Sequence, residues 1–227
     1  VLIGTHAFVA YGNMLGVRWS SADVARTQDI DFAHAGRNIS LALSEDFQVR
    51  THEAIESLEM GFLPVSGLAG KTGGACLIPN EKEFRLDFLT TVGRAGEVPY
   101  EHPDLHVVLQ PLKYMEFSLV DVQQAAILSG AGAILVNVPH PARYALHKLI
   151  VAVEREGAFI AKTGKDLLQA GLLLGVLREE RPWQVEEAWD DLQRRGPGWR
   201  DRAQRGLASL DARFPGEGFA AWLQGAL

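Results

Sequence analysis

The pattern of apolar and polar positions divides the chain into two parts that are expected to fold differently. Up to about residue 138, short apolar runs alternate with turn residues, whereas from about residue 140 apolar positions recur at helical spacing. Prolines flank His140, and we place a boundary there, between domains of residues 1–138 and 139–227. The pattern therefore predicts an α/β lobe followed by an all-helical lobe.

The first lobe opens with an apolar run that ends in glycine. Residues 1–3 predict a buried strand, and Gly4-Thr5 predicts a turn into a helix that continues to about Leu15. Another helix is predicted at residues 51–60, and the glycine-rich residues 67–74 predict a loop. Further strands are predicted at residues 30–33, 62–65, 75–78, 84–89 and 131–136. Together these elements predict an α+β fold with a small mixed sheet and flanking helices.

The second lobe reads as successive helices separated by glycine and proline. Pro141 and Pro182 suit first helical turns, and Gly157 suits a C-terminal stop. Helices are predicted at residues 141–156, 162–179, 182–196 and 199–214.

Composition narrows the class of protein without naming a partner. The 227 residues and 47% apolar content suffice for one sizeable core or two modest ones, and the net charge of −6 argues against a general polyanion-binding surface. The single cysteine, Cys76, excludes an internal disulfide and favours the cytoplasm. The most apolar stretch, residues 167–177, is shorter than the roughly 20 residues that a bilayer requires, so no membrane span is expected. Because the chain begins at Val1 without a methionine, we expect it to be part of a longer protein. The sequence does not indicate an oligomeric state.

The segment Asp29-Ile30-Asp31 carries the first candidate chemistry. Side chains alternate along a strand, so both aspartates are expected on one face and Ile30 on the other. Two adjacent carboxylates repel unless a cation lies between them, which predicts a site for Mg²⁺ or Mn²⁺. An Asp-x-Asp alone is more often a solvated strand end, so the surrounding residues must decide.

Two neighbouring features favour the metal site. Asp87 lies between Leu86 and Phe88 in an apolar strand, where an unpaired charge would be costly to bury, and metal sharing would offset that cost. The Gly4-Thr5 turn places backbone N–H groups and a hydroxyl at a helix N-terminus, which stabilises phosphate oxygens.

These residues resemble the nucleotidyltransferase superfamily, in which a Gly-Ser-like turn, an Asp-x-Asp strand and one more acidic strand follow in this order. The closer likeness is to bacterial proteins of the abortive-infection toxin type (AbiEii-like), because Arg26-Thr27-Gln28-Asp29-Ile30-Asp31 resembles their metal-binding segment. Residues 140–149 similarly resemble the helix that brings a lysine toward the nucleotide phosphates.

The resemblance implies an enzyme that transfers a nucleoside monophosphate from an NTP to a hydroxyl on RNA, protein or a small molecule, releasing pyrophosphate. It implies that Asp29 and Asp31 bridge two metal ions and that Asp87 helps one of them to activate the hydroxyl. The nucleotide-binding residues that it implies are Gly4, Thr5, His6, Arg26, Arg143 and Lys148.

Alternatives remain open from the sequence. A nucleotidyltransferase-fold module could bind nucleotide or a partner protein without turnover. Metal-dependent glycosyltransferases also use Asp-x-Asp, although usually after a longer nucleotide-binding domain. Gly70-Lys71-Thr72 fails as a P-loop because the required earlier glycine is Val65. The arginines between residues 194 and 205 could bind RNA, but the aspartates near them favour a salt-bridged surface.

Overall fold

The chain folds into two compact units. The first comprises Val1–Gly16 and Ala25–Val138, and the second comprises Val17–Val24 and Pro139–Leu227. The structure, a computed structural model, describes residues 1–19, 22–25, 27–35, 50–66, 72–79, 81–93 and 96–225.

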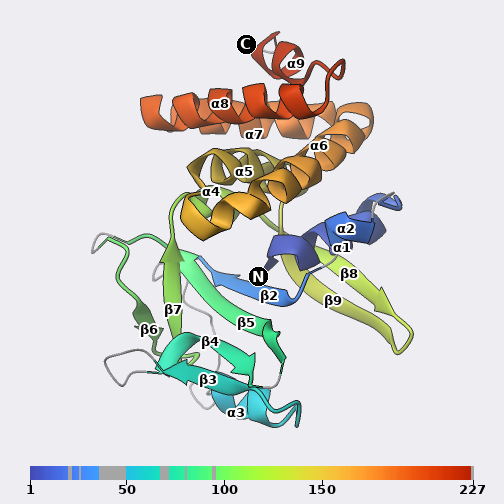
Figure 1. Cartoon of the computed structure of the whole chain (residues 1–227). Coiled ribbons are helices and arrows are strands. Elements are labelled where there is room, and N and C mark those ends of the chain that lie inside the picture. Colours follow the sequence, from blue (N-terminus) through green and yellow to red (C-terminus); the bar gives the residue numbers. More distant parts are fainter. Residues whose placement is uncertain are drawn as a thin grey trace. The chain divides into compact units, whose positions relative to one another are not determined.

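A mixed sheet organises the first unit (Figure 1). Strands β2 and β5 run parallel, as do β5 and β7, whereas β1, β4, β3 and β6 each pair antiparallel with a neighbour. A separate ribbon of β8 and β9 stands beside this sheet. The mixed α/β fold class is confirmed. The strands are β1 (Leu2–Ile3), β2 (Asp29–His34), β3 (Leu63–Ser66), β4 (Thr72–Ile78), β5 (Glu81–Thr91), β6 (Tyr100–His102), β7 (Val107–Leu112), β8 (Val122–Ser129) and β9 (Gly132–Pro139).

Four helices are described between residues 1 and 138: α1 (Gly4–Leu15), α2 (Ala22–Ala25), α3 (Thr51–Glu56) and α4 (Met115–Ser118). The predicted helix at residues 51–60 ends at Glu56, earlier than expected. The predicted loop at 67–74 is wrong at its end, because residues 72–74 belong to β4, where Gly74 packs against the backbone of Val108; residues 67–71 lie outside the described part of the chain.

Alternation along β5 separates two apolar clusters. Leu86 and Phe88 point to the face that is packed by α3, through Ile55. Leu89 points to the opposite face and packs with Ile3, Ala33, Met115 and Leu119. Polar positions at the beginning of β2 and in the middle of β5 share this second face, and they form the candidate site.

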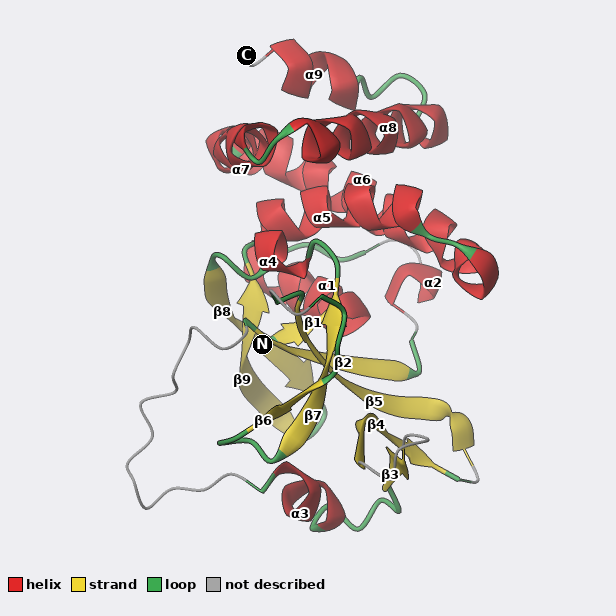
Figure 2. Cartoon of the chain, turned by 90° about the vertical axis from the view of Figure 1, so that its left-hand side faces the viewer, coloured by secondary structure: helices red, strands yellow, loops and turns green. Residues whose placement is uncertain are grey.

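The second unit is helical, as predicted. Figures 1 and 2 both show α5 and α6 in one layer and α7 and α8 in the next. Helix α5 begins at Pro141, with His140 Nδ1 accepting a hydrogen bond of 3.2 Å from the Ala142 N–H. Among the described helices, none is both long enough and apolar enough to cross a bilayer. The helices are α5 (Pro141–Glu154), the 3-10 helix η1 (Gly157–Lys162), α6 (Thr163–Glu180), α7 (Pro182–Arg194), α8 (Pro197–Arg213) and α9 (Phe219–Gly225).

Candidate active site

The three predicted carboxylates lie on one face of the first-unit sheet. In the parallel pairing of β2 with β5, Asp31 lies opposite Asp87 and Asp29 lies opposite Arg85. Residues in register on neighbouring strands project to the same side, and residues two positions apart on a strand do so as well. The face therefore holds three acids from two strands, with an arginine among them.

Gly4 brings the first turn of α1 against this face. Strand β1 pairs Ile3 with Asp31, so the chain enters α1 directly beside that aspartate. Gly4 has a φ of +62°, and a Cβ at this position would collide with Asp31 Oδ2. Glycine is required here both for the left-handed backbone and for the close approach of the carboxylate.

The first turn of α1 has an electrostatic character that suits anions. It contains no acidic side chain, and Ile3 at the N-cap makes no side-chain capping bond. Thr5 is buried and His6 half-buried within this turn. The positive end of the helix dipole thus lies at the Asp31 carboxylate, where it favours negative charge.

Thr27 fixes the beginning of the Asp-x-Asp strand. Its hydroxyl accepts a hydrogen bond of 3.3 Å from the Asp29 N–H, and the Arg85 N–H donates to the Gln28 carbonyl at 3.0 Å. The preceding Arg26, which the resemblance implies as a nucleotide ligand, lies outside the described residues.

Arg85 is a residue of this face that the sequence reasoning missed. Its Nε and Nη2 atoms each lie 2.6 Å from Asp87 Oδ1, and the Asp87 side chain is only 15% exposed. The charge of the Asp87 carboxylate is therefore compensated by a neighbouring cation. The alternation that places Asp87 on this face was the signal that could have placed Arg85 there as well.

The donor set fits a divalent metal in its chemistry. Carboxylate oxygens are the ligands that Mg²⁺ prefers, and Asp29, Asp31 and Asp87 supply them from two adjacent strands. Across the described ranges, no three His, Cys, Asp or Glu side chains already converge as a complete cation site. For Asp87 to bind a metal together with Asp29 and Asp31, its carboxylate would have to release Arg85.

Arg143 and Lys148 belong to α5 in the second unit, where each contacts a carboxylate. Arg143 Nη1 lies 2.7 Å from Asp191 Oδ2, and Lys148 Nζ lies 2.6 Å from Asp166 Oδ1. Arg155 Nε contacts the other oxygen of Asp166 at 2.7 Å. The implied contacts of Arg143 and Lys148 with nucleotide phosphates stay predictions.

Burial shapes the protonation of this second-unit cluster. Burial raises the pKa of the Asp166 carboxyl, but the charge of Lys148 and the hydrogen bond from Arg155 outweigh it and hold that pKa below its ordinary value. Burial, assisted by the charge of Lys148, lowers the pKa of His147 to about 3. His147 is therefore a neutral histidine enclosed in the helical unit.

The arginine-rich part of α7 and α8 is extensively ion-paired. Arg202 Nε and Arg205 Nη2 lie 3.0 and 3.1 Å from the two oxygens of Glu154, and Arg195 Nη2 lies 3.3 Å from Asp191. This arrangement agrees with the salt-bridged surface favoured from the sequence.

Comparison with known proteins gives two matches. A family described as nucleotidyltransferase matches residues 1–194. An antigenic nucleotidyltransferase-like protein from Paracoccidioides brasiliensis is similar in structure, with a TM-score of 0.39 and 14% identity over 90% of this chain and 84% of that chain. No curated protein matches the sequence.

Proposed function

The chain belongs to the nucleotidyltransferase family that matches residues 1–194, and from this premise we propose that it transfers a nucleoside monophosphate from an NTP to a hydroxyl acceptor in a metal-dependent reaction. The observation that carries the proposal is the placement of Asp29, Asp31 and Asp87 on one face, beside the Gly4 turn. The proposed acceptors are RNA, protein and a small molecule, which the experiment below distinguishes.

In this proposal, Asp29 and Asp31 hold Mg²⁺ or Mn²⁺, and Asp87 joins them when it leaves Arg85. When bound, the metal neutralises the triphosphate and acidifies the attacking hydroxyl. The acceptor oxygen bonds to the α-phosphorus as the bond between that phosphorus and the oxygen that bridges the α- and β-phosphates breaks. The hydroxyl proton passes to a carboxylate oxygen of Asp87, and pyrophosphate leaves with its electron pair.

Phosphate binding is assigned to the first turn of α1. The backbone N–H groups of Gly4, Thr5 and His6 would stabilise the triphosphate oxygens, supported by the helix dipole and by the lack of acidic residues in this turn. Arg26, Arg143 and Lys148 are proposed to add positive charge. To contact phosphate, Arg143 would have to release the Asp191 carboxylate, and Lys148 would have to release the Asp166 carboxylate.

One observation favours a second candidate function, a nucleotide- or partner-binding module without turnover. Arg85 neutralises Asp87, which is the carboxylate that would accept the hydroxyl proton. If this ion pair persists when nucleotide binds, the face retains affinity for a metal nucleotide but lacks its base.

The test is to incubate the intact protein with labelled NTPs, Mg²⁺ and a total cell extract, and to separate RNA and protein on gels. Labelled acceptor together with pyrophosphate release supports the enzyme and identifies nucleotide and acceptor together. Calorimetric NTP binding that requires metal, without pyrophosphate release for any acceptor, supports the module.

A finer assignment to the AbiEii-like toxins is also a proposal. It rests on the segment from Arg26 to Asp31, in which Thr27 bonds the Asp29 backbone. Growth arrest on expression of the wild-type chain, absent with Asp31→Asn, would support that assignment.

A further inference from the structure

A cavity of about 320 Å³ lies in the first unit, away from the three aspartates, and is lined by Arg50, His52, Glu53 and His106. Helix α3 carries His52 and Glu53, and its Ile55 packs with Leu86 in one apolar cluster. Leu86 points to the opposite side of β5 from Asp87 because side chains alternate along a strand. The cavity therefore belongs to the sheet face opposite the candidate active site.

Thr51 connects the two segments that line this cavity, the beginning of α3 and the turn before β7. Its hydroxyl donates a hydrogen bond of 2.6 Å to the Leu105 carbonyl, and its N–H donates to the same oxygen at 3.3 Å. These bonds attach the beginning of α3 to the turn that presents His106. The spacing between the His52 side and the His106 side is thus set by the fold.

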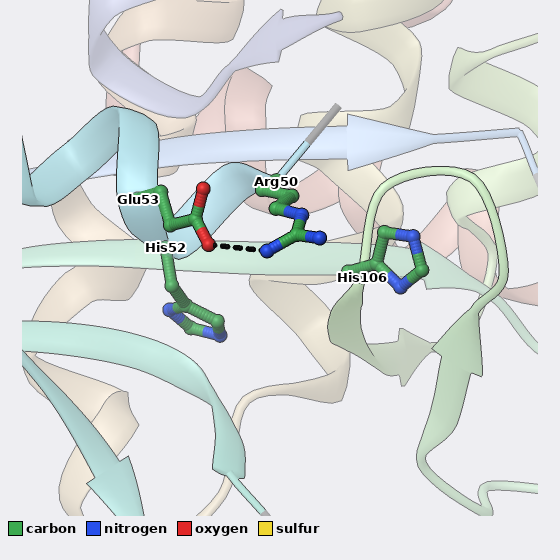
Figure 3. A pocket seen from close by; sticks show the side chains of 4 residues that line it. All are labelled: Arg50, His52, Glu53 and His106. Carbon is green, nitrogen blue, oxygen red and sulfur yellow. Dashed lines mark hydrogen bonds and ion pairs between the residues drawn. The ribbon is translucent and has the colours of Figure 1, made fainter. Parts of the chain in front are cut away.

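The lining side chains are mostly hydrogen-bond donors. Figure 3 shows the Arg50 guanidinium between the Glu53 carboxylate and the His106 ring, with His52 below. Arg50 Nη1 lies 2.8 Å from Glu53 Oε1 in an exposed ion pair, an arrangement that contributes little by itself. His52 contacts Cys76 Sγ through Nδ1 at 3.8 Å, and its buried Nε2 has no hydrogen-bond partner in the described part of the chain.

We propose that this cavity binds a phosphate monoester, with the Arg50 guanidinium and a ring nitrogen of His106 donating hydrogen bonds to the phosphate oxygens. Arginine presents a planar fork of donors that matches phosphate geometry. The volume lies at the lower end of ligand pockets, about 300 to 1,000 Å³, which suits a group as small as a nucleoside monophosphate.

Glu53 competes with the ligand for Arg50. Substitutions of these two residues are therefore expected to change the ligand affinity in opposite directions. Arg50→Ala should weaken binding about tenfold, because it removes a charge-assisted contact. Glu53→Gln should tighten binding about threefold, because it frees the guanidinium and removes a repelling carboxylate. His106→Asn keeps a residue that tolerates the positive φ of 47° and should weaken binding by removing the ring.

The experiment is calorimetry on the intact protein without divalent metal, using inorganic phosphate in one arm and adenosine monophosphate in the other. Lys113 and Glu97 form a matched exposed ion pair at 2.8 Å, and Lys113→Ala and Glu97→Gln serve as controls. Equal affinity in the two arms identifies the phosphate group as the ligand, and tighter monophosphate binding adds the nucleoside. No binding in either arm, or binding that is unchanged by Arg50→Ala and Glu53→Gln, overturns the proposal. Neither result depends on nucleotide transfer at the aspartate face.

Discussion

Asp31 and Asp87 lie opposite each other on the neighbouring parallel strands β2 and β5, on the same face of the sheet. Two carboxylates in this arrangement repel unless positive charge compensates them. The first turn of α1 lies against Asp31, and Arg85 contacts Asp87. Positive charge therefore lies beside both carboxylates, and in the proposed reaction a divalent cation would add to it.

The first prediction concerns the charge of Asp31. Asp31→Asn should lower metal-dependent nucleotide transfer by about a hundredfold or more, because it removes a negative ligand without changing the size of the side chain. The melting temperature should stay near that of the wild type. Mn²⁺ titration followed by electron paramagnetic resonance gives a readout independent of turnover, and full activity with full Mn²⁺ affinity would refute the metal site.

Gly4 permits a second prediction, and Gly16, which follows the last residue of α1, serves as the control. Gly4→Ala imposes a Cβ on a φ of +62° and on the space of Asp31 Oδ2, whereas Gly16→Ala imposes it on a φ of +69° with nothing nearby. Gly16→Ala should cost about 1 kcal/mol of unfolding free energy from backbone strain alone. Gly4→Ala should cost clearly more, measured by urea unfolding. Equal losses would show that the approach of Asp31 makes no contribution.

The third prediction concerns Arg85, whose substitution should strengthen metal binding, whereas substitution of Asp31 should weaken it. Arg85→Met removes the cation that contacts Asp87, so the carboxylates should bind Mn²⁺ several-fold more tightly. Lys113→Met, in which a lysine paired with Glu97 is lost, is the control and should leave Mn²⁺ affinity unchanged. Weaker Mn²⁺ binding by Arg85→Met would show that Arg85 supports the site rather than competing for it.

Local patterns predicted much of this arrangement. The shared face of Asp29 and Asp31 follows from alternation within one strand, and the strand at residues 30–33 is confirmed within β2. The helix starting at Gly4 and the helices starting at Pro141 and Pro182 were likewise readable, because glycine and proline restrict where helices begin and end.

Relationships between distant segments were not readable in the same way. The sequence suggested Asp87 as a third acid, but its register beside Asp31 depends on how β2 and β5 pair across the sheet. Likewise, Lys148 meets Asp166 only because α5 and α6 pack together. Strand β7 was not predicted, because Pro111 lies within residues 107–112 and proline is disfavoured inside a strand.

His147 gives a prediction about pH. Its pKa is lowered from an ordinary 6.5 to about 3, so between these values the unfolded chain binds a proton that the folded chain does not. Stability is thus present above pH 6.5 and is lost as the pH falls toward 3, by about 2 kcal/mol between about pH 7 and about pH 5. His147→Leu should remove this part of the pH dependence in urea unfolding at the two pH values. A variant that loses as much stability as the wild type on acidification would contradict a neutral, buried His147.

Lys148 gives the last prediction, because its contact with Asp166 and its implied phosphate contact have different consequences. Lys148→Met leaves Arg155 as the cation that contacts the Asp166 carboxylate, whose side chain is 3% exposed. The substitution should cost about 2 kcal/mol of unfolding free energy. Asp166→Asn in the same background should recover part of that loss, since a neutral amide no longer needs two cations, and a double-mutant cycle measures the coupling. If Lys148 also reaches the nucleotide, Lys148→Met should lower kcat/KM for NTP whereas Asp166→Asn alone should not. Equal kinetic effects of the two single variants would restrict Lys148 to holding the helical unit together.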